Sequence, residues 1–193
     1  MLLRGLVAAS LLASNTPAVP QTVEPDPVPK IVCIHQSEHE YTAGTAFRIG
    51  PNLLVSVNHV IKDGACQMQG QPIHVIYKSP KTDFSMLSDD RKGQFLKVDC
   101  EGFKAGHLYL AVGHARAMDD LTVVPIVATG QYADDGMAVL LGVFTAQPGQ
   151  SGGPIIDAET KKVVGTVNAA NWASGATFSV ELKGSSVCGG HDA

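Results

Sequence analysis

A serine flanked by glycines is the first feature of this 193-residue sequence that could carry out chemistry. The stretch Gln147–Asp157 reads QPGQSGGPIID and contains Ser151. A serine hydroxyl is a weak nucleophile until a base takes its proton and hydrogen-bond donors stabilise the oxyanion that forms. Neighbouring glycines let the backbone fold tightly and bring its amides close to a carbonyl. The stretch therefore predicts a nucleophile loop, which requires a histidine and a carboxylate elsewhere in the chain.

A histidine and an aspartate in suitable contexts precede this serine. His59 ends an apolar run in LLVSVNHVIK, and Asp83 stands one residue before another in SPKTDFSML. Each residue alone is usually a core, cap or turn residue. The three in the order His, Asp, Ser are typical of a catalytic triad. Four rival carboxylates lack the context of Asp83, namely Asp63, Asp89, Asp90 and Asp99.

The rest of the chain reads as short strands that must position these residues. No window shows a sustained helical period, though a short helical turn is expected after His59. About six runs precede Asp90 and about six follow Gly102, with the charged stretch 89–102 as connector, which predicts an all-β sandwich or barrel. The clearest runs are Lys30–His35, Gly44–Ile49, Leu53–Val57, Cys66–Met68, Ile73–Tyr77, Phe84–Leu87, Leu108–Val112, Leu121–Ala128, Met137–Phe144, Pro154–Ile156, Val163–Val167 and Thr177–Leu182.

These motifs resemble those of chymotrypsin-like (trypsin-like) serine proteases, especially short HtrA-like bacterial members without a PDZ domain. The resemblance covers Ile31 to about Leu182 and rests on five segments: GTAFRIGPNLLVSVNHVI, TDFSML, FKAGHLYLAVGHA, PGQSGGPIID and VVGTVNAANWASGATFSVEL. It implies an all-β fold of two six-stranded antiparallel Greek-key β-barrels with the active site between them. The expected protease domain is 30–187, with barrels at about 30–98 and 103–187 and a tail at 188–193.

The resemblance also implies a role for each residue in hydrolysing the peptide bonds of a protein or peptide substrate through an acyl-enzyme. Ser151 is the nucleophile, His59 the general base and Asp83 the group that orients the imidazole. The amides of Gly149 and Ser151 form the oxyanion hole. No cofactor and no metal are expected, because no pair of histidines or cysteines has a metal-binding spacing.

Two residues depart from the family pattern. Gln150 stands where animal digestive members carry an aspartate that pairs with a newly freed N-terminal amine. An amide cannot form that ion pair, so the oxyanion hole is expected to form without N-terminal activation cleavage. Asn168 stands where many members carry a serine beside the triad aspartate, and its amide could donate to Asp83.

The same resemblance places a substrate pocket between 145–150 and 168–170, with Gly175 and Ala176 opposite. No aspartate is there to bind Lys or Arg, and no histidine favours a glutamate. A neutral pocket for small or medium apolar side chains is expected. The predicted substrate-binding residues are Thr145, Gln150, Asn168, Ala169, Ala170 and Ala176.

Two other functions are open. Residues 149–153 also fit the G-x-S-x-G elbow of α/β-hydrolase esterases, with Asp157 and His191 as further partners. That elbow needs a helix after the serine, whereas Pro154 and a strand pattern follow here. The other alternative is a catalytically inactive homologue that acts as a binding module; it is disfavoured because His59, Asp83, Ser151 and Gly149 are all present.

The four cysteines allow two disulfides or buried thiols. Residues 1–18 read as a signal peptide with a short basic start and an apolar stretch too short to span a membrane. The protein is therefore expected to be secreted or periplasmic, and export to such a compartment would favour disulfides. If the barrels close as in the family, the resemblance implies the pairs Cys33–Cys66 and Cys100–Cys188.

Composition narrows the partners. Residues 19–29 are proline-rich and predict an extended linker. The net charge is −4, with 14 Lys and Arg against 18 Asp and Glu, and no basic cluster stands out. A nucleic-acid partner is therefore disfavoured.

Overall fold

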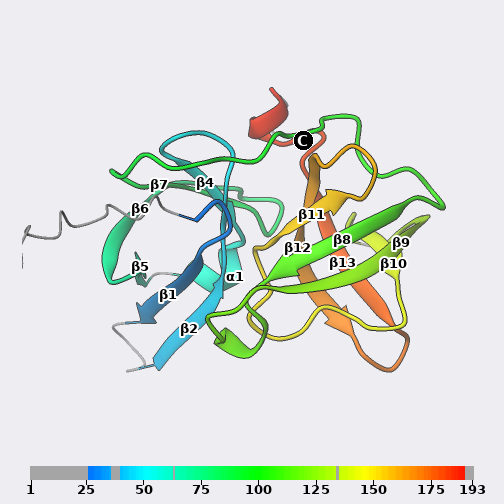
Figure 1. Ribbon diagram of the computed structural model, residues 1–193, viewed down its shortest axis with the longest axis horizontal. Helices are drawn as coiled ribbons and strands as arrows, with labels where there is room; N and C mark the ends of the chain where they lie inside the picture. Colours follow the sequence, from blue (N-terminus) through cyan, green and yellow to red (C-terminus); the bar gives the residue numbers. More distant parts are fainter. Residues whose placement is uncertain (1–25, 36–39, 63, 134, 190–193) are drawn as a thin grey trace, which may run out of the picture.

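The computed structural model describes residues 26–35, 40–62, 64–133 and 135–189, which fold almost entirely into strands (Figure 1). The first seven strands form one sheet in the order β2-β1-β5-β6-β7-β4-β3. The ends of this order, β2 and β3, are separated in sequence only by Ala46, so the sheet curls back toward itself as a nearly closed barrel. The strands are β1 (Lys30–His35), β2 (Glu40–Thr45), β3 (Phe47–Arg48), β4 (Leu53–Ser56), β5 (Ala65–Met68), β6 (Gln71–Lys78) and β7 (Ser85–Ser88).

The second sheet is a closed barrel in the order β10-β13-β12-β11-β8-β9. Every strand pair in both sheets is antiparallel. Because β2 and β3 count as one interrupted strand, the predicted all-β double barrel is confirmed. The strands are β8 (Leu108–Gly113), β9 (Thr122–Tyr132), β10 (Ala138–Leu141), β11 (Pro154–Asp157), β12 (Val163–Asn171) and β13 (Ala176–Glu181).

Helical structure is limited to single turns. The short turn expected after His59 is the four-residue helix α1 (Asn58–Ile61), which begins one residue before this histidine. Two 3-10 turns follow, η1 (Ala115–Ala117) and η2 (Ser186–Cys188). None of the helices in the described part of the chain is long and apolar enough to cross a membrane.

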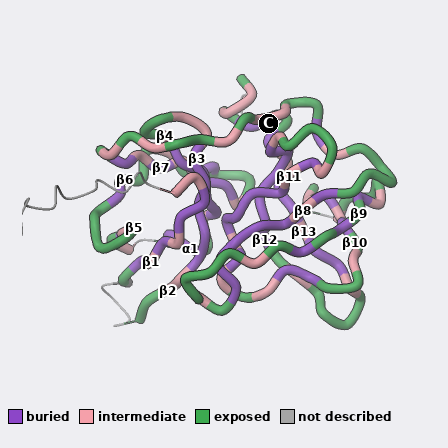
Figure 2. The backbone as a smooth tube through the Cα atoms, viewed as in Figure 1, coloured by how far each residue is buried: buried purple, intermediate pink, exposed green. Residues whose placement is uncertain are grey.

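Three apolar clusters hold the barrels together, one inside each barrel and one between them. Figure 2 shows the buried backbone concentrated in the strands that face one another. The cluster between the barrels combines Phe47 and Phe84 from the first with Val112, Val163 and Leu182 from or just after strands of the second. Burial of this shared apolar surface favours a fixed placement of one barrel against the other.

Both disulfides implied by the resemblance are formed. Cys33 and Cys66 stand directly opposite each other on β1 and β5. This is the expected pairing of the first strand with the fourth, with β2 and β3 counted as one. The second disulfide joins Cys100 in the connector to Cys188 in η2. The first disulfide cross-links two strands of the first barrel, and the second ties the C-terminal turn to the connector.

The proline-rich stretch corrects one expectation, because its last residues pack on the first barrel instead of forming a linker. Pro27 O and Pro29 O accept hydrogen bonds from Arg48 N at 2.8 Å and Ala46 N at 3.0 Å. The Val28 side chain is buried in the cluster between the barrels. Proline favours an extended backbone whose carbonyls remain available, and that geometry suits docking beside a strand. The expected signal peptide and residues 19–25 lie outside the described residues.

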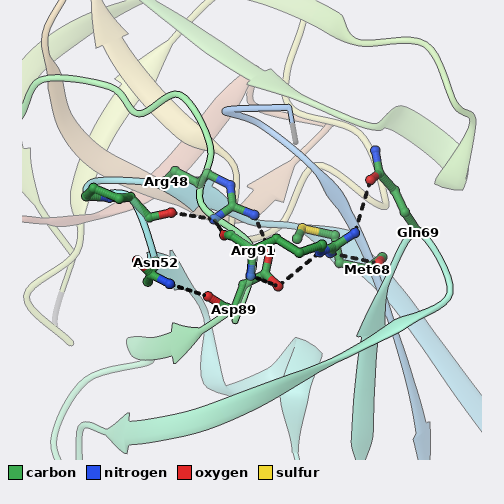
Figure 3. A network of polar contacts seen from close by, with 7 residues as sticks. Arg48, Asn52, Met68, Gln69, Asp89 and Arg91 are labelled. Atoms are coloured by element: carbon green, nitrogen blue, oxygen red, sulfur yellow. Dashed lines mark hydrogen bonds and ion pairs between the residues drawn. The ribbon is translucent and has the colours of Figure 1, made fainter. Parts of the chain in front are cut away.

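A buried ion-pair network joins β3 to the segment that follows β7 (Figure 3). The Arg48 side chain is fully buried and pairs with Asp89, which is only 2% exposed. Arg48 Nη1 also donates to Pro51 O at 3.0 Å, and Arg91 Nε donates to Asp89 Oδ1 at 3.1 Å. Burial alone would raise the pKa of Asp89, but the hydrogen bonds from Arg91 and Arg48 outweigh it and lower the pKa.

We expect Asp89→Asn to destabilise the fold by about 3–5 kcal/mol at neutral pH, because it leaves the buried guanidinium without a counter-charge. The lowered pKa of Asp89 means that its contribution is present above the usual aspartate pKa and is lost as pH falls through the folded value. Urea unfolding at pH 7 and at lower pH should therefore show that the free energy of unfolding decreases less on acidification in the variant than in the native chain. Exposed Asp90, substituted in the same way, is the control; equal losses in both variants would contradict the prediction.

Candidate active site

The one-turn helix α1 presents His59 to the space between the barrels. Val60 and Ile61 bury their side chains in the first barrel and leave the His59 side chain 45% exposed. His59 N donates to Asp83 Oδ1 at 2.9 Å, and His59 Nδ1 contacts Asp83 Oδ2. Backbone and ring thus bind both oxygens of one carboxylate, which fixes the ring with Nε2 as its remaining nitrogen.

Asn58 ties the histidine turn to the aspartate loop, a contact that the sequence reading missed. Asn58 Nδ2 donates to Ser79 O at 3.1 Å and to Thr82 O at 3.0 Å. Its Oδ1 accepts a hydrogen bond from the Ser85 hydroxyl. An amide that neighbours a candidate histidine is the only signal that could have suggested this role.

Asn168 on β12 reaches the same carboxylate from the second barrel. Asn168 Nδ2 donates to Asp83 Oδ2 at 2.9 Å, as the sequence suggested. Asn168 O accepts a hydrogen bond from Ser151 Oγ at 3.3 Å. Within the described residues, Ser151 Oγ makes no hydrogen bond to His59. Asn168 therefore links the carboxylate and the serine hydroxyl.

The environment of Asp83 keeps it ionised. Its side chain is 28% exposed. Burial alone would raise the pKa of Asp83, but the hydrogen bonds and charge of His59, with the amide of Asn168, outweigh it and lower the pKa. An ionised carboxylate here favours the imidazole tautomer that carries its proton on Nδ1.

The loop that carries Ser151 is held by both barrels. Ser151 O accepts from Thr45 N of β2 at 2.9 Å, and Gly152 N donates to Val167 O of β12 at 2.7 Å. A Cβ on Gly152 would lie 2.2 Å from Thr45 O, and one on Gly153 would lie 2.1 Å from Val112 O. The glycines after the serine are therefore needed because neighbouring backbone approaches so closely.

The peptide before Gly149 has a defined orientation. Pro148 O accepts from Arg116 N at 2.5 Å, and in a trans peptide the next N–H points the opposite way. Gly149 has φ of +91°, which favours glycine. Within the described part of the chain, neither Gly149 N nor Ser151 N has an acceptor. Two backbone donors beside a serine hydroxyl are a recognised arrangement for binding a developing oxyanion.

Gln150 closes the loop through neutral hydrogen bonds. It is fully buried, its Oε1 accepts from Gln147 N at 2.8 Å, and its Nε2 donates to Thr122 O at 3.1 Å. An amide can do both because it carries a donor and an acceptor. The loop is thus anchored to β9 without an ion pair.

A small pocket of about 130 Å³ opens beside Ser151. Three predicted residues line it: Asn168, Ala169 and Ala170. The other three, Thr145, Gln150 and Ala176, are buried residues outside its lining. Ala146, Gln147 and Pro148 complete one wall, inside the predicted range 145–150, and Val167 and Trp172 complete the other. The exposed Trp172 donates from Nε1 to Ala146 O at 3.3 Å, which places it at the rim.

The elbow interpretation does not fit the structure. Strand β11 begins at Pro154, where an α/β-hydrolase would have a helix. Asp157 accepts hydrogen bonds from Glu159 N and Thr160 N, so it shapes the turn between β11 and β12. His191, the other partner of that interpretation, lies outside the described residues, as does Asp63, one of the rivals to Asp83.

Several solved structures with a similar fold are proteases. The active form of the Rv3671c protease from M. tuberculosis matches with a TM-score of 0.65 and 20% identity over 91% of this chain and 90% of that one. A serine endoprotease from Yersinia pestis matches with a TM-score of 0.66 and 16% identity, over 80% of this chain and 58% of that one. The HtrA-type protease AlgW, solved with a tripeptide, matches with a TM-score of 0.62 and 19% identity, over 81% of this chain and 56% of that one.

These likenesses define the class of fold. The chain has the chymotrypsin-like double-barrel fold, which serine proteases of the HtrA type share. The sequence matches no family model and no curated protein. The chain spans under two thirds of the length of the Yersinia and AlgW chains.

We expect Asn168→Ala to raise the pKa of Asp83, because it removes a hydrogen-bond donor that favours the charged carboxylate. A ¹³C NMR titration of the Asp83 carboxyl would measure this. Asn171→Ala is the control, since Asn171 lies on the same strand and binds only the following turn. An unchanged titration in Asn168→Ala would contradict the assigned contact.

Proposed function

We propose that this protein is a serine endopeptidase that uses His59, Asp83 and Ser151 as a catalytic triad. The observation that carries the proposal is the doubly bound His59–Asp83 pair, which Asn168 connects to Ser151. This constellation lies on a fold that serine proteases share. A base held by an ionised carboxylate beside a loop serine is the requirement for activating a hydroxyl.

In the first step Ser151 Oγ attacks the carbonyl carbon of the scissile peptide. The hydroxyl turns from Asn168 O to His59 Nε2, and its proton moves to that nitrogen as the new C–O bond forms. Such hydrogen bonds often tighten only when substrate is bound. Asp83 stabilises the imidazolium that results and does not itself become protonated.

The charge that develops on the substrate oxygen is received by Gly149 N and Ser151 N. Both donors lie on the nucleophile loop, and the contact of Pro148 O with Arg116 turns the Gly149 amide away from η1. Loss of one such donor typically costs about 10²–10³ in rate. Because Gln150 anchors the loop with an amide, the site should form without a new N-terminal ammonium.

The second half of the reaction returns the enzyme to its starting state. The tetrahedral intermediate collapses, the C–N bond breaks, and His59 gives its proton to the leaving amine. Water then attacks the acyl-serine ester, giving a proton to His59. The C–O bond to Ser151 breaks, and the serine recovers its proton from the imidazolium. Every proton is accounted for by one histidine.

The substrate is proposed to be a protein or peptide bound in extended form. Ala169 and Ala170 of β12 pair with β13 on one side only, and Asn168 lies at the register shift before them. The other edge of 168–170 can therefore accept a peptide strand beside Ser151. The side chain before the scissile bond would enter the adjacent pocket, whose lining carries no charged side chain. This favours small or medium apolar residues.

The site of action is proposed to be outside the cytoplasm, secreted or periplasmic. Both disulfides fit an oxidising compartment. The proposed organisation has a signal peptide at 1–18, a protease domain at 30–187 with barrels at about 30–98 and 103–187, and a tail at 188–193. Mass spectrometry of the exported protein would give its first residue.

A fluorophosphonate probe tests the catalytic assignment. We expect the native chain to be labelled at Ser151 and to cleave casein, with Ser151→Ala abolishing labelling and lowering turnover by about 10⁶-fold. Ser186→Ala, in an exposed turn, is the matched control and should behave as the native chain. No labelling of the native chain would favour an inactive binding module. Labelling with ester turnover but no peptide cleavage would favour an esterase.

A peptide library that varies the residue before the scissile bond tests the pocket. We expect alanine or valine there to exceed lysine and glutamate, since the neutral lining gives a buried charge no partner. Ala170→Asp should reduce cleavage after apolar residues and increase cleavage after lysine. A native preference for charged residues would contradict the assigned pocket.

A further inference from the structure

The turn His114–Met118, which contains η1, lies between the docked N-terminal segment and the nucleophile loop. Arg116 and Ala117 have φ of 54° and 58°, in the left-handed region that residues with a Cβ rarely adopt. Such a backbone persists only where its surroundings hold it in place. Contacts on both sides of this turn provide that support.

On one side, the His114 ring binds the N-terminal segment. The residue is 4% exposed, its Nε2 lies 2.9 Å from Val28 O, and its Nδ1 lies 3.1 Å from Met118 O. A carbonyl oxygen only accepts, so each contact requires a ring N–H; a neutral imidazole has one and a protonated imidazole has two. The contact with Val28 O is a hydrogen bond when Nε2 carries a proton. Lys30 Nζ adds a hydrogen bond of 3.2 Å to Ala117 O. The proposed triad makes no use of this buried histidine.

The Val28 carbonyl is itself fixed. Its side chain is 5% exposed within the cluster between the barrels, and the flanking prolines bind the backbone of residues 46 and 48. Asp26 Oδ1 accepts from Val28 N at 2.8 Å. The segment therefore brings a carbonyl with a set position to the histidine.

On the other side, the turn contacts the nucleophile loop. Arg116 N donates to Pro148 O at 2.5 Å, and a Cβ on Gly149 would lie 2.4 Å from His114 O. His114 N donates to Thr45 Oγ1 at 2.9 Å, and that hydroxyl donates to Gly149 O at 2.8 Å. The turn thus binds the Pro148 carbonyl directly and the Gly149 carbonyl through the Thr45 hydroxyl.

We propose that His114 is a positioning residue that couples the docked segment 26–29 to the oxyanion site. The Val28–His114 contact keeps the strained turn in place, and the turn keeps the Gly149 amide directed away from itself. The effect on catalysis rests on the proposed function, whereas the coupling itself is a property of the backbone. A docked peptide carbonyl thereby supports the loop that Gln150 anchors from its other side.

Two substitutions separate the ring nitrogens. The amide nitrogen of glutamine can reach the position of Nε2, and that of asparagine the position of Nδ1. His114→Gln should therefore keep the contact with Val28, whereas His114→Asn should lose it. Val28→Asn should weaken the same contact by loosening the docked segment, because a polar side chain without a partner is unfavourable in an apolar cluster.

The readouts are catalysis and amide exchange on the full chain. We expect His114→Asn to lower kcat by about 10-fold or more with KM nearly unchanged, since oxyanion donors act in the transition state. His114→Gln should stay within about threefold of native. Hydrogen–deuterium exchange should become faster at Arg116 and across 147–153 in His114→Asn and in Val28→Asn. Active-site titration and melting curves correct for misfolded protein.

Each outcome decides a separate point. Combining Val28→Asn with His114→Asn should add little to either alone if both act through one contact; additive losses would overturn the coupling. Unchanged exchange at Arg116 in His114→Asn would overturn it too, whatever the activity. Should the native chain cleave nothing while exchange still responds as expected, the proposed function fails and the coupling stands.

Discussion

The structure depends on one constraint: the loop 147–153 has no regular secondary structure, yet its backbone lies between two barrels. Buried peptide groups without partners are costly, so the barrels themselves must supply hydrogen bonds. Thr45 from the first barrel binds Ser151 O, and Val167 from the second binds Gly152 N. The loop geometry is therefore a consequence of how the barrels pack, and neither barrel alone would define it.

The spacing of glycines in QPGQSGG follows from this constraint. Gly149 needs a positive φ, and the two glycines after Ser151 face backbone oxygens too close for any Cβ. Gln150 is the side chain that the loop buries completely, and both ends of its amide are bonded. Local sequence and inter-barrel packing thus specify the same conformation, which is expected of a site that must be preformed.

The strands were largely predictable because alternating apolar residues report which face is buried, and the disulfides followed from the resemblance. The contact of Asn168 with Asp83 could be suggested because it needs only residue type and strand position. The two segments that line the pocket were predicted, but three of the six residues named within or opposite them are buried outside its lining: Thr145, Gln150 and Ala176. A resemblance locates a segment, whereas the direction of each side chain depends on how that segment packs. The docking of Val28 was missed because prolines predict an extended chain and do not say what it lies against.

Asp83 and its rival Asp89 are both at least partly buried, but their binding partners give them different chemistry. Asp89 is bound by guanidinium groups, which keep their charge at any relevant pH, so its pair is fixed. Asp83 is bound by an imidazole, whose charge can change, and by an amide from the opposite barrel. A lowered pKa alone does not distinguish them. The partner does, because only a titratable partner lets an ionised carboxylate assist a proton transfer beside a serine.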